Sequence, residues 1–259
     1  MYRKKYRLTQ TITWIKLLKN LIKWNRSSMK LQGKKLSVGV VRFPGSNCDF
    51  DALNFFKKFG HAAEFVWYKD THVPRFDLLV LPGGFAFGDR SYIKATGSYH
   101  IDPGALAIGS PVLKAVRHAA DSGTPVLGIC NGFQILVKAG LLPGKLLQNV
   151  SKKFFCDNVA CKVTGNSFFG DDSMRNKTFT VPVAHGYGRY AIPKHELEKL
   201  EHSGQIFLKY KGFNPNGSVA DIAGVCNEQK NIFGMMPHPE RSPDGKYFMR
   251  ALEKYAAIH

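Results

Sequence analysis

Beyond residue 35, apolar and polar positions follow two different periods along the chain. Short apolar runs that predict buried strands occupy residues 36–41, 64–67, 77–81 and 126–129. Between these runs, apolar positions recur at helical spacing over residues 49–59, over 111–120 and from 131 onward. This alternation of strand and helix predicts an α/β fold, with a mostly parallel sheet and helices on both of its faces.

The second half of the chain departs from this alternation. Shorter runs separated by turns between Lys152 and Pro182 predict a small antiparallel insertion. The apolar run from Asn231 to Met236 predicts a last strand, which ends at Pro237. Ligands of open α/β sheets bind beyond the carboxyl ends of the parallel strands, so we expect the chemistry where these strands end.

A Gly-x-Cys-x-Gly sequence follows the apolar run that begins at Val126. Gly128 and Gly132 flank Cys130, and a helical pattern begins at about Asn131. A sharp strand-to-helix turn crowds the residues on either side of its central residue, which favours glycine at those positions. The N–H groups at the start of the helix would favour a thiolate. We therefore predict that Cys130 is a nucleophile; a buried core cysteine is the alternative.

A second glycine-rich stretch, residues 82–89, follows the strand predicted at 77–81. Backbone N–H groups at the end of a strand can stabilise an oxyanion, and we assign this role to Gly84 together with the N–H of Asn131. A plain glycine-rich turn is the alternative for this stretch alone. The segment from Arg90 to Pro103 is expected to cover the site.

The last predicted strand is followed by Pro237-His238-Pro239-Glu240. A residue before proline favours extended backbone, in which side chains two positions apart point the same way. His238 can then act as the base for Cys130, with Glu240 orienting the imidazole. His185, in a glycine-flanked loop, competes for the role of base but has no such carboxylate.

Two other patterns were weighed as ligand sites. The five cysteines are odd in number and scattered, which favours a reducing compartment, and Cys156 and Cys161 lack a histidine pair at zinc-finger spacing. We therefore expect no metal site. The segment from Gly140 to Leu146 resembles a phosphate loop, but it has three residues between its glycines instead of four and lacks the final Ser or Thr. No ATP site is predicted there.

The net charge of +18 is concentrated at the N-terminus. Residues 1–35 contain eleven Lys or Arg and no acidic residue, and the remaining 26 basic and 19 acidic residues give an ordinary balance of +7. This argues against nucleic acid as a partner.

No apolar run approaches the ~20 residues that span a bilayer, so no membrane span is predicted. Residues 1–28 could be an addition upstream of a start at Met29, a transit sequence or a functional tail.

Taken together, these motifs resemble those of the class I glutamine amidotransferases, and most closely the glutaminase subunits of phosphoribosylformylglycinamidine synthase. Besides the Cys130 and His238 motifs, the similar stretches are residues 44–49, 82–85, 184–186 and 221–225. The resemblance implies a flavodoxin-like amidotransferase domain over residues 36–259, preceded by the basic extension 1–35. It also implies that Gly83, Phe85, Gln134 and His185 contact the substrate. Tyr187 stands where the family commonly has an acidic residue, and the Arg90 to Pro103 segment differs from the usual one.

The resemblance further implies a cytoplasmic purine-biosynthesis enzyme that hydrolyses L-glutamine through a Cys-His-Glu triad and a glutamyl thioester. Ammonia would pass to a separate synthetase subunit, which uses ATP and Mg²⁺ to amidate formylglycinamide ribonucleotide, and a small third subunit is usual. No cofactor is expected in this chain itself. The competing hypotheses are an amidotransferase of another pathway, a stand-alone cysteine hydrolase, and a nucleic-acid-binding protein driven by charge.

Overall fold

One nine-stranded mixed sheet forms the centre of the fold, with strand order β2-β1-β3-β6-β13-β12-β11-β8-β9. The computed structural model describes residues 35–258 except 94–97, 166–172 and 176. Residues 1–34 of the predicted basic extension, 1–35, therefore lie outside the described residues. Residues from Lys35 onward form one compact unit.

The parallel half of the sheet comprises the predicted strands. Its members are β2 (Ala62–Trp67), β1 (Ser37–Arg42), β3 (Leu78–Leu81), β6 (Val126–Ile129) and β13 (Ile232–Met235). All residues of β3, β6 and β13 are buried, because helices cover both faces of the sheet there. Continuous apolar runs are typical of such strands. The predicted α/β class is confirmed.

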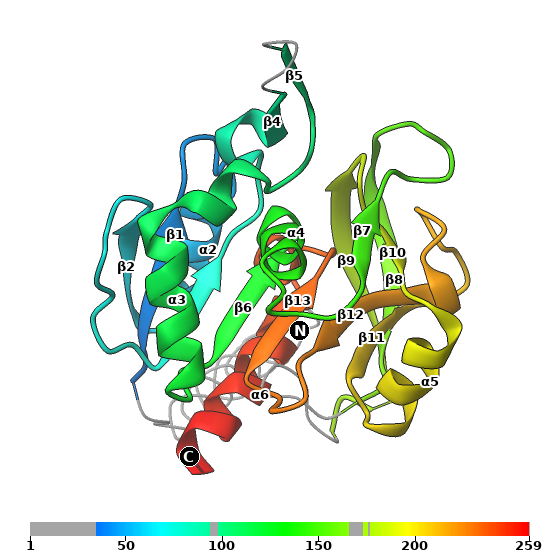
Figure 1. Ribbon diagram of the computed structural model, residues 1–259. Coiled ribbons are helices and arrows are strands. Elements are labelled where there is room, and N and C mark those ends of the chain that lie inside the picture. The colour runs from blue at the N-terminus through cyan, green and yellow to red at the C-terminus, as the bar shows by residue number, and fades with distance from the viewer. Residues whose placement is uncertain (1–34, 94–97, 166–172, 176, 259) are drawn as a thin grey trace, which may run out of the picture. The chain divides into compact units, whose positions relative to one another are not determined.

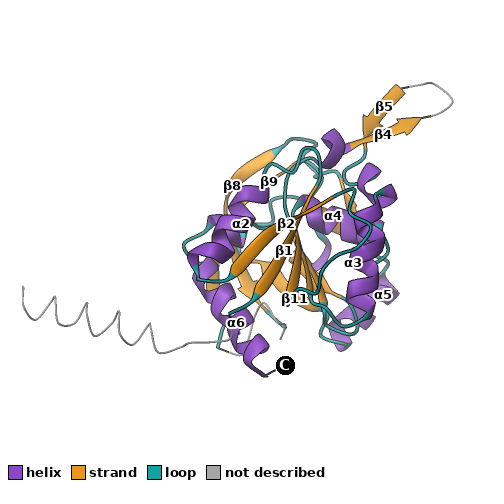
Figure 2. Cartoon of the chain, turned by 90° about the vertical axis from the view of Figure 1, so that its left-hand side faces the viewer, coloured by secondary structure: helices purple, strands orange, loops and turns teal. Residues whose placement is uncertain are grey.

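Helices pack on the two faces of the sheet, as Figure 2 shows, with α2 and α6 on one side and α3 and α4 on the other. The helices are α2 (Asp49–Lys58), α3 (Pro111–Asp121), α4 (Asn131–Lys138), α5 (Lys194–His202) and α6 (Gly245–Ile258). Pro111 begins α3, where a missing N–H costs nothing. The N-cap of α2, Cys48, makes no side-chain cap hydrogen bond; Asp49 pairs with Arg42 and accepts the N–H of Phe50, and Asp51 pairs with Arg241.

Four antiparallel strands continue the same sheet beyond β13. They are β12 (Ile222–Cys226), β11 (Ile206–Tyr210), β8 (Phe155–Val163) and β9 (Thr178–His185). Only β8 and β9 belong to the insertion that the sequence predicts. The antiparallel part is thus larger than the small insertion expected, because β11 and β12 join it edge to edge.

Two short antiparallel pairs lie outside the main sheet: the hairpin of β4 (Arg90–Ile93) with β5 (Ser98–Ile101), and β7 (Lys145–Leu147) with the distant β10 (Arg189–Ala191). The 3-10 segments are η1 (Ala86–Asp89), η2 (Leu106–Gly109), η3 (Val219–Asp221) and η4 (Pro239–Arg241). Figure 1 shows the β4–β5 hairpin projecting away from the sheet. Of the segment expected to cover the site, the two strands extend outward, residues 94–97 lie outside the described residues, and Ile101 and Pro103 line the cavity beside Cys130. None of the helices in the described ranges has the length and apolar character needed to cross a membrane.

Candidate active site

The predicted strand-to-helix turn is present at Cys130. Strand β6 ends at Ile129, helix α4 begins at Asn131, and Cys130 between them has φ 50° and ψ −103°. A positive φ in a residue with a Cβ is strained and is common at active sites. Figure 1 shows α4 directly beyond β6. Cys130 is 5% exposed and lies at the first N–H groups of the helix.

The two flanking glycines are required by space at this turn. A Cβ on Gly132 would lie 1.9 Å from the carbonyl oxygen of Leu81 in β3, and one on Gly128 would lie 2.8 Å from the backbone of Gly132. Both contacts are with backbone, which cannot rotate away. The Gly-x-Cys-x-Gly spacing thus reflects the close approach of α4 to β3 and β6.

Parallel pairing of β6 with β13 brings the second half of the site to the same sheet edge. Met235 lies opposite Ile129 in the register, and the N–H of Cys130 donates to the carbonyl of Met235 at 2.8 Å. The chain leaving β13 reaches His238, whose N–H donates to Pro182 of β9 at 2.9 Å. Residues more than 100 positions apart therefore meet at the carboxyl ends of neighbouring strands.

His238 and Glu240 form a buried pair. The Nδ1 atom of His238 lies 2.7 Å from Oε1 of Glu240, and both side chains are 2% exposed. The sequence predicts an extended segment here. The structure instead has His238 at φ −105° and ψ 84°, followed by the 3-10 turn η4. Pro239 keeps His238 out of the helical region, and the turn then brings the carboxylate back to the imidazole.

Opposing influences set the protonation of His238. Burial alone lowers the pKa of His238, but the Glu240 carboxylate and the Cys130 sulfur outweigh burial and hold that pKa well above its usual value. An imidazole with a raised pKa is a stronger base toward a thiol proton. Because Nδ1 is paired with Glu240, Nε2 is the nitrogen left for proton transfer, and the thiols of Cys130 and Cys48 are also close enough to raise the pKa of the ring.

Cys48 is a neighbour of His238 for which the sequence predicts no role. Its Sγ, a ring nitrogen of His238 and a carboxylate oxygen of Glu240 all lie within 4.8 Å of one another. Cysteine, histidine and glutamate side chains are all ligands of zinc, so this cluster by itself does not exclude a cation. The expectation of no metal site remains a prediction.

The glycine-rich stretch after β3 packs against the same groups. A Cβ on Gly83 would lie 2.6 Å from Cε1 of His238 and 3.4 Å from the Cβ of Cys130. Gly84 has φ +138°, and a Cβ there would lie 2.4 Å from the backbone nitrogen of Asn47. Both glycines are therefore required by close packing, and the Gly84 backbone lies at the cavity next to Cys130.

Asn131 and Gln134 connect the start of α4 to two loops. The Asn131 side chain donates to Asp89 and to Gln134, each at 2.8 Å, and accepts from the N–H of Ala86 at 3.0 Å. The Gln134 amide in turn donates to the carbonyl of Tyr187 at 2.7 Å. Gln134, expected to contact substrate, thus also holds the loop that contains Tyr187.

A cavity of ≈ 300 Å³ opens beside Cys130, at the lower end of the range for small-molecule sites. Gly84, Phe85, Gln134 and His185, all assigned from the sequence, line it together with Cys130. Gly83, Asn131, His238 and Glu240 do not line the cavity. Gly83 and His238 lie behind Cys130, and Asn131 is buried at the start of α4.

His185 is in the cavity wall but is poorly suited to act as the base. Burial lowers the pKa of His185 to about 4, and its Nε2 lies 3.5 Å from the Asn216 side-chain nitrogen. A Cβ on Gly188 would lie 2.5 Å from its ring, which shows how closely the loop encloses it. A neutral, enclosed imidazole without a carboxylate partner fits a wall residue better than a base.

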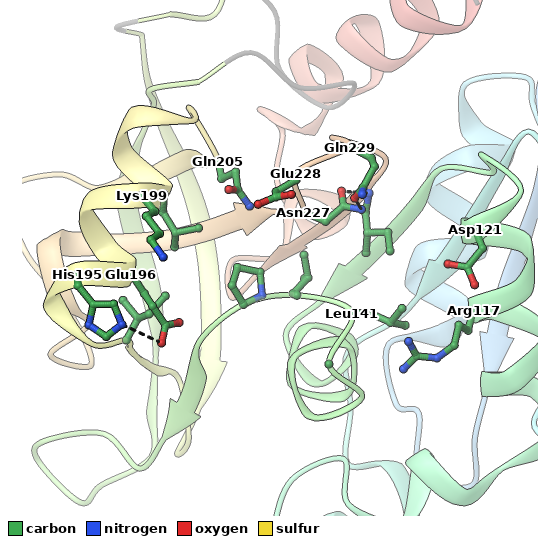
Figure 3. Close-up of a pocket in the computed structure, with 16 residues that line it drawn as sticks. Arg117, Asp121, Leu141, His195, Glu196, Lys199, Gln205, Asn227, Glu228 and Gln229 are labelled. Carbon is green, nitrogen blue, oxygen red and sulfur yellow. Dashed lines mark hydrogen bonds and ion pairs between the residues drawn. The ribbon is translucent and has the colours of Figure 1, made fainter.

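A larger pocket of ≈ 670 Å³ lies near the opposite, amino-terminal ends of β6 and β13. Figure 3 shows Arg117 and Asp121 of α3 on one side of it and His195, Glu196 and Lys199 of α5 on the other. It contains no cysteine, and its charged groups are of both signs. Gly140 to Pro143 border it, but this segment leads into strand β7, so its N–H groups do not begin a helix as in a phosphate loop.

The fold and this group of side chains define an α/β enzyme with a cysteine nucleophile at a strand-to-helix turn and a His-Glu pair at the next strand. The chain belongs to the glutamine amidotransferases, because the model of the CobB/CobQ-like glutamine amidotransferase domain matches residues 35–251. The predicted resemblance to this family is confirmed.

Relatives and a solved structure agree with this assignment. The phosphoribosylformylglycinamidine synthase subunit PurQ of Thermomicrobium roseum is 48% identical over 215 residues, 79% of this chain and 87% of the relative. The corresponding subunit of Alkaliphilus metalliredigens is 43% identical over 226 residues, 84% of this chain and 95% of the relative. A chain in the structure of PurLQS from Thermotoga maritima matches with a TM-score of 0.74 and 37% identity, covering 85% of this chain and 99% of that one.

Proposed function

We propose that this chain is the glutaminase subunit of a phosphoribosylformylglycinamidine synthase in purine biosynthesis. The observation that carries the proposal is the Cys130 turn beside the buried pair of His238 and Glu240, in a chain that is 42–48% identical to several PurQ subunits. Glutamine is the substrate, and the cavity next to Cys130 receives it.

The geometry supports a two-stage hydrolysis. His238 takes the thiol proton, the Cys130 sulfur attacks the side-chain amide carbon of glutamine, and the developing oxyanion is stabilised by the N–H groups of Gly84 and Asn131. The proton held by His238 passes to the departing nitrogen, so ammonia leaves and a glutamyl thioester remains. His238 then takes a proton from water, which releases glutamate and restores the thiol. Glu240 keeps Nδ1 occupied, so that Nε2 carries the proton at each step.

Ammonia requires an acceptor, which we assign to a partner. The synthetase subunit would use ATP and Mg²⁺ to convert formylglycinamide ribonucleotide to the amidine, and a small accessory subunit would complete the complex. We expect no cofactor in this chain and a cytoplasmic location. Exposed apolar side chains surround the cavity mouth, namely Phe85, Ile101 and Phe154 at 47%, 60% and 54% exposure. Such a cluster beside a polar site is typical of a protein-protein surface.

A glutaminase assay on the purified chain, titrated with the synthetase subunit and its substrates, tests the proposal. We expect weak activity alone and a rise of at least about tenfold on adding the partner, equivalent to ~1.4 kcal/mol in barrier. A small shift of the Gly83-Gly84 loop suffices, because losing one oxyanion donor costs on the order of a hundredfold in rate. Full turnover without a partner would favour the stand-alone cysteine hydrolase. Absence of turnover both with and without the partner would refute the proposal.

A further inference from the structure

Asp89 is a buried acidic residue at the end of the glycine-rich stretch, and the triad chemistry does not use it. It is 9% exposed, lies in the wall of the cavity that contains Cys130 and has φ 52°. This left-handed backbone conformation is uncommon for residues other than glycine, although asparagine and aspartate adopt it more often than most. Burial of a carboxylate and a strained backbone both cost free energy, which indicates that Asp89 has a role beside the nucleophile.

The Asp89 carboxylate acts on the Asn131 side chain, which connects two segments of the site. Oδ1 of Asp89 accepts a 2.8 Å hydrogen bond from Nδ2 of Asn131, and Oδ1 of Asn131 accepts the N–H of Ala86. Together with the bond to Gln134, these contacts use both donor hydrogens of the amide. The segment from Ala86 to Asp89 is thereby fixed to the first turn of α4. Gly84 and the Asn131 N–H, our two assigned oxyanion donors, lie on the two sides of this connection.

The backbone of Asp89 makes a further connection, to the base of the projecting β4–β5 hairpin. Its carbonyl accepts the N–H of Asp102 at 2.7 Å, directly after β5. The hairpin base and the start of α4 therefore both contact this one residue, through its main chain and its side chain respectively.

We infer that Asp89 is a positioning residue, whose carboxylate holds the Asn131 side chain and so keeps the Gly84 loop and the start of α4 in the spacing that oxyanion stabilisation needs. The inference rests on the proposed glutaminase activity. It assigns to Asp89 no contact with the reacting atoms.

The surroundings of Asp89 make the charge of this carboxylate sensitive to pH. Burial raises the pKa of Asp89 to about 6, while hydrogen bonds from Asn131 and from the Gly104 backbone oppose this rise and the charge of Asp102 adds to it. Asp102 itself pairs with Lys138 and lies 3.9 Å from His100. The other titratable side chains that line the same cavity are Cys130, Lys152, His185 and Tyr187. A charged carboxylate accepts a stronger hydrogen bond than a neutral acid, so acid weakens the connection to Asn131.

Two substitutions of Asp89 test the inference in the complex with the synthetase subunit. Asp89→Asn retains an acceptor that no longer titrates, and asparagine tolerates the left-handed backbone. We expect the ratio of wild-type kcat to Asp89→Asn kcat to exceed one at pH 8 and to fall toward one as pH drops through about 6. Asp89→Ala, which has no acceptor, should lower kcat at least tenfold at pH 8 with a smaller change in KM. Asp121→Asn, at an exposed position of α3, is the matched control and should leave both constants unchanged.

Alkylation of Cys130 by iodoacetamide separates positioning from loss of the fold. This reaction needs the nucleophile and its base but no oxyanion donor, so its rate, measured by peptide mapping, should stay within about threefold of wild type in Asp89→Ala. A pH-independent ratio for Asp89→Asn, an unchanged kcat for Asp89→Ala, or a loss of alkylation equal to the loss of kcat would each overturn the inference. An inactive wild-type complex would instead mean that the proposed function is wrong.

Discussion

His238 and Glu240 are hydrogen-bonded to each other at 2.7 Å across a single intervening proline, and both side chains are buried. The 3-10 turn after His238 makes this contact possible, because it folds the carboxylate back onto the ring that precedes it. The same proline removes a backbone N–H and limits the conformations of His238, so the pair is held before any substrate arrives.

Substitutions in this pair and at Cys130 should separate three roles. Cys130→Ala should abolish glutamine hydrolysis and leave the melting temperature within a few degrees of wild type, since one sulfur is removed from a strained turn. His238→Ala should remove nearly all activity, whereas Glu240→Gln should leave more, because an orienting group is less critical than the nucleophile or the base. Steady-state glutaminase kinetics check all three variants. Activity in Cys130→Ala equal to wild type would refute the mechanism.

Gly132→Ala should be strongly destabilising. The new Cβ would lie 1.9 Å from the Leu81 carbonyl, so α4 would have to move away from β3 at a cost of about 3 kcal/mol or more in the free energy of unfolding. Gly109→Ala is the matched control, since nothing lies within 4 Å of a Cβ there and its φ is not positive. Its effect should stay within about 0.5 kcal/mol. Chemical denaturation gives the free energy of unfolding of both variants. Equal values for the two would show that α4 can move away from β3 at little cost.

Asp89→Asn should stabilise the protein at neutral pH although it slows catalysis. The folded-state pKa of Asp89 is raised from 3.8 to about 6, so this group's favourable contribution is complete below pH 3.8 and is lost as pH rises through 6. The side-chain amide of the Asp89→Asn variant does not titrate, so its contribution to stability does not change over this pH range. We expect the unfolding free energy of the variant minus that of wild type to increase between pH 4 and 7 by about 2 kcal/mol, discounted for partial solvent screening. A difference that stays constant across this range would contradict the assignment of the buried charge.

Removing residues 1–28 should not change the stability of the remaining chain. Strand β1 begins at Ser37, and its two neighbours in the sheet, β2 and β3, lie later in the chain. A protein beginning at Met29 is therefore expected to melt within a few degrees of the full chain. A large fall in melting temperature would mean that the N-terminal segment packs on the fold.

Features that depend on neighbours in the chain can be predicted from the order of the amino acids. Apolar runs of strand length marked β1, β3, β6 and β13, and the glycines around Cys130 marked the turn, because local sterics dictate the residues at such a turn. The two-residue spacing of His238 and Glu240 likewise indicated a pair, although the turn that joins them is 3-10 and not extended.

The choice of the distant segments that share the site depends on how the whole chain folds. Cys48 lies beside His238, and Asp89 beside Asn131, because strand order places the loops after β1, β3, β6 and β13 at one sheet edge. Strand order also made the antiparallel part larger than predicted, since β11 pairs with the distant β8, and β12 connects β11 to β13. Periodicity reports which face of an element is buried, but the choice of neighbour depends on the packing of the whole sheet.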